Sequence, residues 1–263
     1  MTFGWEGFSF DHPDEWLPTV LSGRRSEGYV RIASAGRLML QVRWRQAKKP
    51  ADATAFLDAY LGRLGQDAKK AKQSFDSERQ TEGERVHYRY TGSVYGRGTM
   101  FYDANDGRSF VFEVVSSKND SSLTILREAT RSFRAGEVRD RWSVLGLDLS
   151  LPKGLEVEKQ EFLSGKTRLN WRAKPGKLLA ERWGLADQLL SRHGQAEWAA
   201  AILGVEPRKL QEDADGLRAS IPGPFWRGRT EALVVHQADR NQLIVLRSES
   251  KNPDWRPTCD WLN

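Results

Sequence analysis

The clearest hydrophobic pattern in the chain is a short alternation of bulky and polar residues that occurs twice. Each copy begins at a glycine and ends at a proline, and the second copy, 146–152, lies 139 positions after the first, 7–13. A period of two predicts a half-buried strand, and proline can end a strand because it has no N–H to donate. The bulky positions are Phe8, Phe10 and His12 in one copy and Leu147, Leu149 and Leu151 in the other.

This repeat predicts that the chain consists of two copies of one module. A tryptophan precedes each copy, at Trp5 and Trp142. Further matches keep their order along the two halves while their spacing drifts, which is expected when loops change length and elements persist. We predict a first module over residues 1–136 and a second, divergent repeat over 141–263, joined by a short polar linker.

The first module is predicted to alternate strands with two helices. After a polar loop, strands are expected at 29–32 and 38–44. A helix beginning at Pro50 follows, because apolar residues then recur at spacings of three and four. That apolar stripe comprises Phe56, Leu57, Tyr60, Leu61 and Leu64.

Three more strands and a closing helix complete the expected first module. The strands are placed at 86–90, 99–103 and 110–115, and the helix over 123–133. Residues 92–98, which contain three glycines, are interpreted as a turn. The Asn-Asp-Gly sequence at 105–107 predicts a tight hairpin, because these residues tolerate the positive φ that such turns need.

The second module is expected to repeat this order. A hairpin turn is predicted at 164–166, and residues 178–203 are interpreted as a helix broken near His193. Strands are predicted at 217–221, 230–236 and 242–247. A short, proline-weakened segment is expected to end the module. The predicted fold class is therefore α+β, with two tandem modules that each pack an antiparallel sheet against helices.

The order of elements resembles the PsbP-like superfamily. The segment from Phe8 to Trp16 is similar to the opening strand, proline and tryptophan of that superfamily, whereas the second copy has Leu155 where a tryptophan would be expected. The superfamily includes photosystem II PsbP, a Ran-binding nuclear import factor, DcrB-type lipoproteins and type VI effector chaperones. The resemblance implies protein binding rather than enzymatic activity. A helix-grip fold is the alternative.

The composition suits a soluble globular protein without a dedicated nucleic-acid arm. Hydrophobic residues make up 39% of the chain and charged residues 29%, with a net charge of +6 that is spread over both halves. No secretory signal or membrane-spanning run is visible, and Cys259 is the only cysteine. A single cysteine cannot form an intrachain disulfide, which fits a reducing compartment. We therefore expect a cytoplasmic protein.

No catalytic or metal-binding pattern stands out in the sequence. Phosphate-binding glycine loops, paired cysteines and His-Glu-x-x-His are absent, and the four histidines are scattered. His12 beside Asp11 is a conceivable acid–base pair, and Cys259 a conceivable nucleophile. A solvated strand end and a buried thiol explain these residues more simply. We predict no catalytic residues, no cofactor and no metal.

Two segments combine arginine with aromatic residues, as protein interfaces and single-stranded nucleic-acid sites both do. One is the predicted hairpin around Trp226, and the other is its counterpart near Tyr95. The candidate binding residues are Tyr95, Arg97, Phe225, Trp226, Arg227 and Arg229. A basic edge is formed by Arg43, Arg45, Lys48 and Lys49. Ordinary turn and solvent-facing residues are the alternative interpretation.

These observations favour a non-enzymatic protein-binding adaptor, scaffold component or chaperone-like partner. The alternative is a nucleic-acid-binding protein that uses its arginine and tryptophan surfaces. An enzyme assembled between the two modules is a third possibility. The partner in the leading hypothesis is another protein, and no membrane partner is expected.

Overall fold

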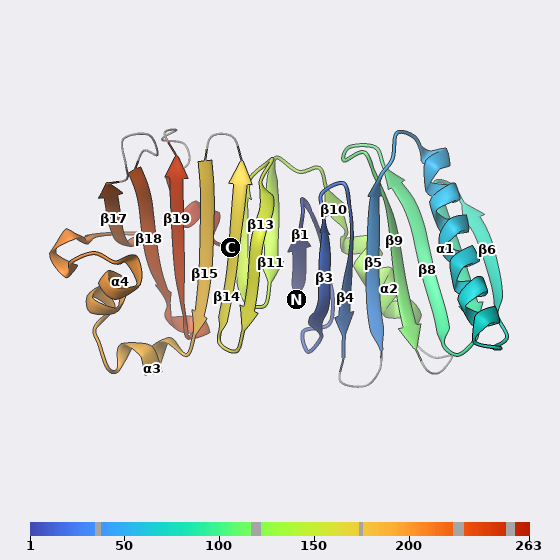
Figure 1. The fold of residues 1–263 in the computed structure, drawn as a ribbon, viewed down its shortest axis with the longest axis horizontal. Helices are drawn as coiled ribbons and strands as arrows, with labels where there is room; N and C mark the ends of the chain where they lie inside the picture. The colour runs from blue at the N-terminus through green and yellow to red at the C-terminus, as the bar shows by residue number, and fades with distance from the viewer. Residues whose placement is uncertain (35–37, 117–121, 174–175, 223–228, 251–255) are drawn as a thin grey trace. The chain divides into compact units, whose positions relative to one another are not determined.

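The computed structural model describes residues 1–34, 38–116, 122–173, 176–222, 229–250 and 256–263. The chain divides into two compact units, Met1–Asp140 and Arg141–Asn263. A seven-stranded antiparallel sheet forms the body of each unit (Figure 1).

The sheet of the first unit has the strand order β3-β4-β5-β9-β8-β7-β6. The apolar residues of β9 make it the central strand, and all its residues are buried. β6 is an edge strand whose residues are all exposed. The bounds are β3 (Leu17–Arg24), β4 (Glu27–Ala33), β5 (Met39–Gln46), β6 (Asp76–Glu82), β7 (Arg85–Thr91), β8 (Tyr95–Asp103) and β9 (Arg108–Ser116).

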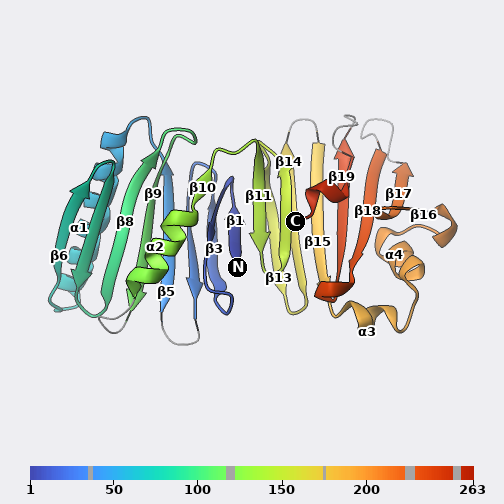
Figure 2. The ribbon, with the colours of Figure 1, turned by 180° about the vertical axis from the view of Figure 1, so that it is seen from behind.

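Two helices pack on opposite faces of this sheet, as Figures 1 and 2 show together. α1 (Pro50–Lys70) places the predicted stripe, including Leu57 and Leu61, on a core of β7, β8 and β9. α2 (Ser122–Ser132) covers β9, part of β8 and the short strand β2 (Phe8–Asp11). Phe133, directly after α2, lies edge-on against Phe110 at 4.7 Å between ring centroids.

Each repeated Gly-to-Pro segment begins in the turn of a β-hairpin. β1 (Thr2–Trp5) pairs with β2 around Glu6 and Gly7, whose φ angles are 49° and 81°. β11 (Arg139–Val144) and β12 (Leu147–Pro152) are joined in the same way by Leu145 and Gly146, at 49° and 82°. Positive φ at both turn positions is the geometry that a right-handed strand twist favours in two-residue hairpins. β10 (Arg134–Ala135) adds a short strand beside β2.

The second unit has the same strand order in its sheet, β13-β14-β15-β19-β18-β17-β16. Its two α-helices lie between β15 and β16, at the sequence position that α1 has in the first unit. The strand bounds are β13 (Glu156–Leu163), β14 (Lys166–Ala173), β15 (Gly176–Gly184), β16 (Gln211–Asp213), β17 (Gly216–Pro222), β18 (Arg229–Gln237) and β19 (Gln242–Ser250). The helices are α3 (Ala186–Leu190), α4 (Gln195–Leu203) and the 3-10 turns Pro207–Lys209, Ala238–Arg240 and Cys259–Trp261.

The predicted α+β class is wrong, because the chain is predominantly β. The described residues form nineteen strands but only four α-helices. The two α-helices of the second unit have five and nine residues, and no α-helix follows β19 in the described part of that unit. Short helices leave the sheets to supply most of the buried apolar surface.

Two local predictions fail because strand position overrides local pattern. Residues 178–184 belong to strand β15 rather than a helix, since β15 lies between β14 and β19 and is partly covered on both faces. A strand that is covered on both faces no longer alternates apolar and polar residues. Its apolar residues can then occur at the spacings that also predict a helix. Residues 17–24 form edge strand β3 rather than a loop, and no residue of this strand is buried.

Ionic contacts between partly and fully buried side chains lie beside the turn that joins β1 and β2. Arg25 Nη1 donates to Asp140 Oδ2 at 2.7 Å, and the Asp140 side chain is only 1% exposed. Arg108, itself buried, pairs with Asp106 and donates to the Arg25 carbonyl oxygen at 3.1 Å. A side chain at Gly7 would collide with the Arg25 guanidinium and Asp140. The Arg25–Asp140 ion pair therefore packs directly against Gly7 of the turn.

We predict that Arg25→Met lowers the free energy of unfolding by about 3 kcal/mol. Removing one partner leaves the buried Asp140 carboxylate without its cation, and such losses run to about 3–5 kcal/mol when both partners are buried. The partial exposure of Arg25 places it at the low end. Arg31→Met, in the neighbouring strand, is the matched control, because Arg31 makes only an exposed contact with Thr19. Urea unfolding that gives equal losses for both variants would contradict this account.

Candidate functional site

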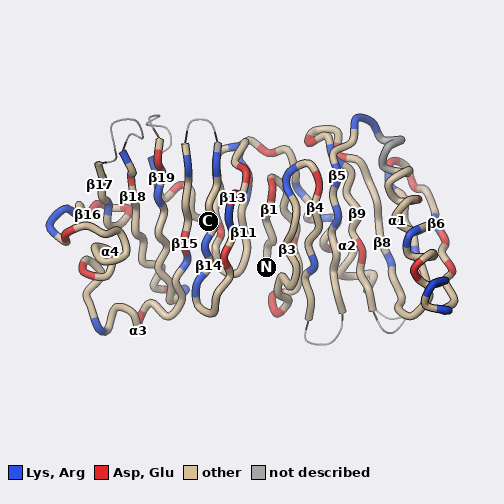
Figure 3. Tube along the Cα trace, in the orientation of Figure 1, with Lys and Arg blue, Asp and Glu red and all other residues tan. Residues whose placement is uncertain are grey.

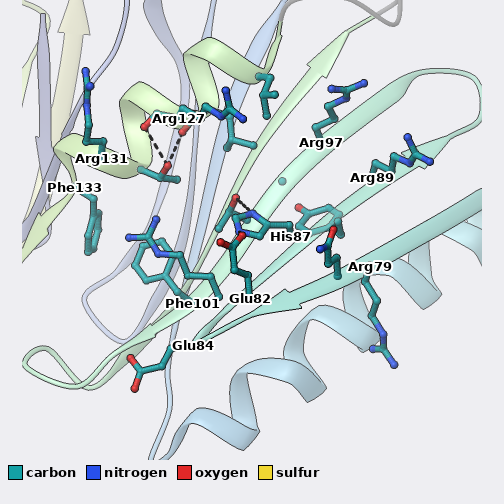
Figure 4. Close-up of a pocket in the computed structure, with 18 of the residues that line it drawn as sticks. Arg79, Glu82, Glu84, His87, Arg89, Arg97, Phe101, Arg127, Arg131 and Phe133 are labelled. Carbon is teal, nitrogen blue, oxygen red and sulfur yellow. Dashed lines mark hydrogen bonds and ion pairs between the residues drawn. The ribbon is translucent and has the colours of Figure 1, made fainter.

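An open groove lies between α2 and the outer face of β6, β7 and β8 in the first unit. It has a volume of about 1470 Å³, and Figure 4 shows the side chains that line it. Its floor is the end of the sheet face that α2 leaves uncovered. Leu123, Arg127 and Arg131 contribute to the wall on the α2 side.

Strand register arranges the floor as three rows of side chains across β6, β7 and β8. Alternate residues of a strand share a face, so one set of partners from the pairing faces the groove. The rows are Glu78–Arg89–Arg97, Gln80–His87–Thr99 and Glu82–Arg85–Phe101. Carboxylates thus lie on β6, whereas cationic side chains lie mainly on β7 and β8.

Several floor residues are held by contacts within the rows. Arg89 Nη2 lies 2.6 Å from Glu78 Oε2, and His87 Nε2 lies 3.5 Å from Glu82 Oε2. His87 Nδ1 is 3.0 Å from the Thr99 hydroxyl. Arg89 stands directly opposite Arg97 on the next strand, and like charges in that position destabilise a sheet.

The wall on the α2 side presents arginines at helical spacing. Leu126 and Ala129 are buried, whereas Arg127 and Arg131 are exposed and line the groove. Arg127 and Arg131 are four residues apart and therefore occupy one face. In the described part of the chain, no carboxylate forms an ion pair with either side chain.

The opposite face of the same strands carries a buried cluster around Glu113. Its carboxylate accepts hydrogen bonds from Tyr60 at 2.8 Å, Tyr88 at 2.8 Å and Tyr90 at 3.2 Å. Burial raises the pKa of Glu113, and the three hydroxyl donors oppose that rise in part. Burial, together with the Glu113 charge, also raises the pKa of each tyrosine. The phenols therefore stay protonated and donate.

Gly96 and Gly98 make this cluster possible. Tyr88 and Tyr90 lie opposite Gly98 and Gly96 in the sheet, and their rings extend over these glycines. A Cβ at Gly98 would lie 2.2 Å from Tyr88 Cζ, and a Cβ at Gly96 would lie 2.2 Å from Tyr90 Cε1. Arg97, between the two glycines, belongs to the opposite face and lines the groove. The interpretation of residues 92–98 as one turn is therefore wrong, because β8 already begins at Tyr95.

The sequence-derived binding residues fall in different places. Arg97 lines the groove, and Tyr95 lies on the same strand face with 37% of its surface exposed. Arg229 is exposed at the start of β18 in the second unit. Phe225, Trp226 and Arg227 lie outside the described residues.

The basic edge does not form one uniform surface. Arg45, Lys48 and Lys49 are exposed, whereas Arg43 is half-buried. The Arg43 guanidinium lies over the Tyr29 ring at 4.2 Å, close to the Glu113 cluster. Arg43 therefore supports the core of the first unit.

Sequence reasoning missed most of the groove. The residues it did not select are His87, Arg85 and Arg89 on β7 and Arg127 and Arg131 on α2. The alternation of Arg85, His87 and Arg89 with Val86, Tyr88 and Tyr90 was a usable signal, because it predicts one polar strand face. Nothing in the sequence indicated that α2 would lie beside that face.

Other candidate chemistries find little support in the described residues. Within them, no group of three His, Cys, Asp or Glu side chains could hold a metal ion. No helix there is long and apolar enough to cross a membrane. Cys259 Sγ donates to the Asp215 carbonyl oxygen at 3.2 Å, and burial raises the pKa of the thiol. A raised pKa disfavours the thiolate that a nucleophile needs.

Comparisons with known proteins identify no family. No protein-family model matches the sequence, and no curated protein matches it. Among solved structures, the chain is similar to the di-domain ARO/CYC StfQ from the steffimycin biosynthetic pathway, with 12% identity, covering 91% of this chain and 74% of that one. The TM-score is 0.17, so this similarity carries no argument about fold or function. The resemblance to PsbP-like modules stays a prediction.

We predict that Gly98→Ala destabilises the first unit, because the new methyl group must displace the Tyr88 ring from the Glu113 carboxylate. The expected loss is about 1–3 kcal/mol, as for overpacking in a core. Gly62→Ala in α1 is the matched control. Nothing lies within 4 Å of a Cβ there, so the helix should gain about 0.5–1 kcal/mol. Denaturant unfolding measures the stability of both variants. A Gly98→Ala variant as stable as the wild type would contradict the position of the Tyr88 ring over Gly98.

We also predict that Glu113 gives the protein a specific pH dependence. Its pKa is higher in the folded state than in the unfolded state, so the fold binds the proton more tightly. The free energy of unfolding contributed by Glu113 should therefore fall as the pH rises from about 4.5 through the folded pKa.

The test compares the wild type with Glu113→Gln, which removes the titration while keeping one acceptor oxygen. Unfolding free energies are measured across that pH range. The wild-type advantage over Glu113→Gln should decline as the pH rises. If the difference in unfolding free energy between the wild type and Glu113→Gln stays constant or grows as the pH rises, the pKa of Glu113 is not raised by folding.

Proposed function

We propose that the protein is a non-enzymatic binding protein, an adaptor, scaffold component or chaperone-like partner, and that its groove holds a segment of another protein. The observation that carries the proposal is the open groove, walled by α2 arginines and floored by a polar sheet face. Arginine is enriched at protein interfaces and is common among their most important contact residues. The PsbP-like resemblance of the sequence supports the same proposal.

The mixture of charges in the groove favours a protein partner over a nucleic acid. Seven arginines line the groove together with five carboxylates, and Figure 3 shows both signs interspersed along the first unit. A nucleic acid presents phosphates continuously and would be repelled by the carboxylates of β6. A protein segment can instead match both signs at fixed positions. The arginines are Arg79, Arg85, Arg89, Arg97, Arg127, Arg131 and Arg134, and the carboxylates are Glu78, Glu82, Glu84, Asp103 and Glu128.

The proposal includes a cytoplasmic location. The sequence has one cysteine, Cys259, so an intrachain disulfide cannot stabilise the fold. Proteins of reducing compartments commonly fold without disulfides.

The test is affinity capture with the wild type and the double variant Arg127→Glu/Arg131→Glu, followed by reconstitution with the purified captured protein. Lys69→Glu/Lys70→Glu is the matched control, because it makes the same charge change at exposed positions on α1, outside the groove. We expect one protein to be retained by the wild type and the control, to be lost with the groove variant, and to bind the purified wild type directly.

Two results would contradict the proposal. One is a captured partner that the groove variant retains in full. The other is capture of nucleic acid alone, with affinity that falls steeply as salt rises. Circular dichroism of each variant separates loss of binding from loss of fold.

A further inference from the structure

We infer that the groove takes an extended acidic segment with carboxylates at alternate positions. This inference rests on the proposed function and specifies the chemistry of the partner. It follows from the charge order across the groove, from the spacing of the α2 arginines and from the direction in which the groove runs.

Within the three rows of the floor, the charge changes from acidic on β6 to basic on β7. β6 contributes Glu78, Gln80 and Glu82 to the floor, whereas β7 contributes Arg89, His87 and Arg85. The α2 side adds Arg127, Glu128 and Arg131, all exposed, with the two cations in excess. The acidic edge strand therefore repels an anionic segment, and the arginines attract it to the side of the groove next to α2.

The Arg89 side chain of the floor already has a carboxylate partner. Glu78 pairs with Arg89, and Glu82 lies beside His87. Among the described residues, no ion pair engages Arg127 or Arg131. These two side chains are therefore the positions at which a partner gains most from a carboxylate, since a new ion pair there breaks no existing one.

The spacing of the two α2 arginines matches an extended chain. Residues four apart in a helix are separated by a rise of about 6 Å. Alternate residues of a strand, which point to the same side, are separated by about 6.6 Å. A strand lying along α2 can therefore present carboxylates at positions i and i+2 to Arg127 and Arg131 in turn.

The groove also runs in the direction that this strand requires. Phe133, directly after α2, packs on Phe101 with ring centroids 5.1 Å apart, so the C-terminal end of α2 lies at the Phe101 row. Arg97 lies two rows away along β8, where Figure 4 shows it at the other end of the groove from Phe133. A segment that follows α2 thus meets Arg131, Arg127 and finally the row of Arg97.

The experiment measures the binding of fluorescein-labelled peptides of about eight residues by fluorescence anisotropy at low salt. This length exceeds the roughly five extended residues that span α2. The probe alternates glutamate and threonine. Its isomer, with the same composition, has all glutamates in one block, and a third peptide replaces glutamate with lysine. The protein is the full chain, as wild type, Arg127→Glu/Arg131→Glu and the Lys69→Glu/Lys70→Glu control.

The alternating peptide should bind the wild type and the control equally, and the block isomer should bind more weakly. The groove variant should lose about tenfold or more in affinity, because two attractions become two repulsions. The lysine peptide should not bind. The inference is overturned if the alternating peptide fails to bind, binds no better than its isomer, or binds the groove variant equally well. It is also overturned if oligothymidylate binds in its place.

Failure of this inference and failure of the proposed function give different results. A captured protein that depends on Arg127 and Arg131, together with no binding of the acidic peptides, would keep the groove as a protein-binding site and overturn only the acidic, extended partner. Capture that is independent of both arginines would overturn the proposed function itself.

Discussion

The hydrogen bonds that Glu113 accepts from three tyrosines connect α1, β7 and β9 in the core of the first unit. A buried carboxylate is costly, and the three hydroxyl donors offset part of that cost. Tyr60 belongs to α1, and Tyr88 and Tyr90 belong to β7. One side chain of the central strand β9 therefore forms hydrogen bonds with both a helix and another strand of the sheet. Because side chains alternate along a strand, this contact also determines which residues of β7 face the groove.

The two faces of β7 and β8 therefore have different roles. On one face, tyrosine rings cross two glycines to reach a buried acid. On the other, His87, Arg89 and Arg97 form the floor of an open groove. A one-residue slip of β7 would exchange these sets, burying arginine and exposing tyrosine. The buried cluster thus sets the register on which the candidate site depends.

The second unit shows that a repeated strand order need not repeat a site. Its buried acid, Glu181, lies on β15 and pairs with Lys166 at 3.1 Å and Arg168 at 3.4 Å. Trp198 of α4 packs edge-on against Trp183. The described residues of this unit include no α-helix after β19 that corresponds to α2 of the first unit.

The sequence allowed prediction of elements whose pattern is local. The apolar stripe of α1, the turn at 105–107 and the helix over 123–133 are confirmed, because helix periodicity and turn residues are read from neighbouring positions. The apolar spacing of 178–184 wrongly predicts a helix, since the burial of β15 on both faces comes from strands distant in sequence. The sequence also wrongly predicts Gly96 and Gly98 as turn residues, because their role depends on tyrosine rings from another strand.

Only Arg97 of the groove was anticipated. The groove is created by the position of α2 over an antiparallel sheet, and no local pattern encodes which part of the sheet a helix leaves open. Arg127 and Arg131 look like ordinary exposed helix residues until the neighbouring strand face is known. Sequence reasoning therefore recognised the residue types of a binding surface more readily than their assembly.

The most direct test of the groove as the binding surface is hydrogen–deuterium exchange of the full chain with and without its captured protein partner. Binding should slow amide exchange in α2 and in β6, β7 and β8, because these elements line the groove. Exchange in α1, on the opposite face of the sheet, should change little. Protection confined to α1, to the basic edge or to the second unit would contradict the central claim.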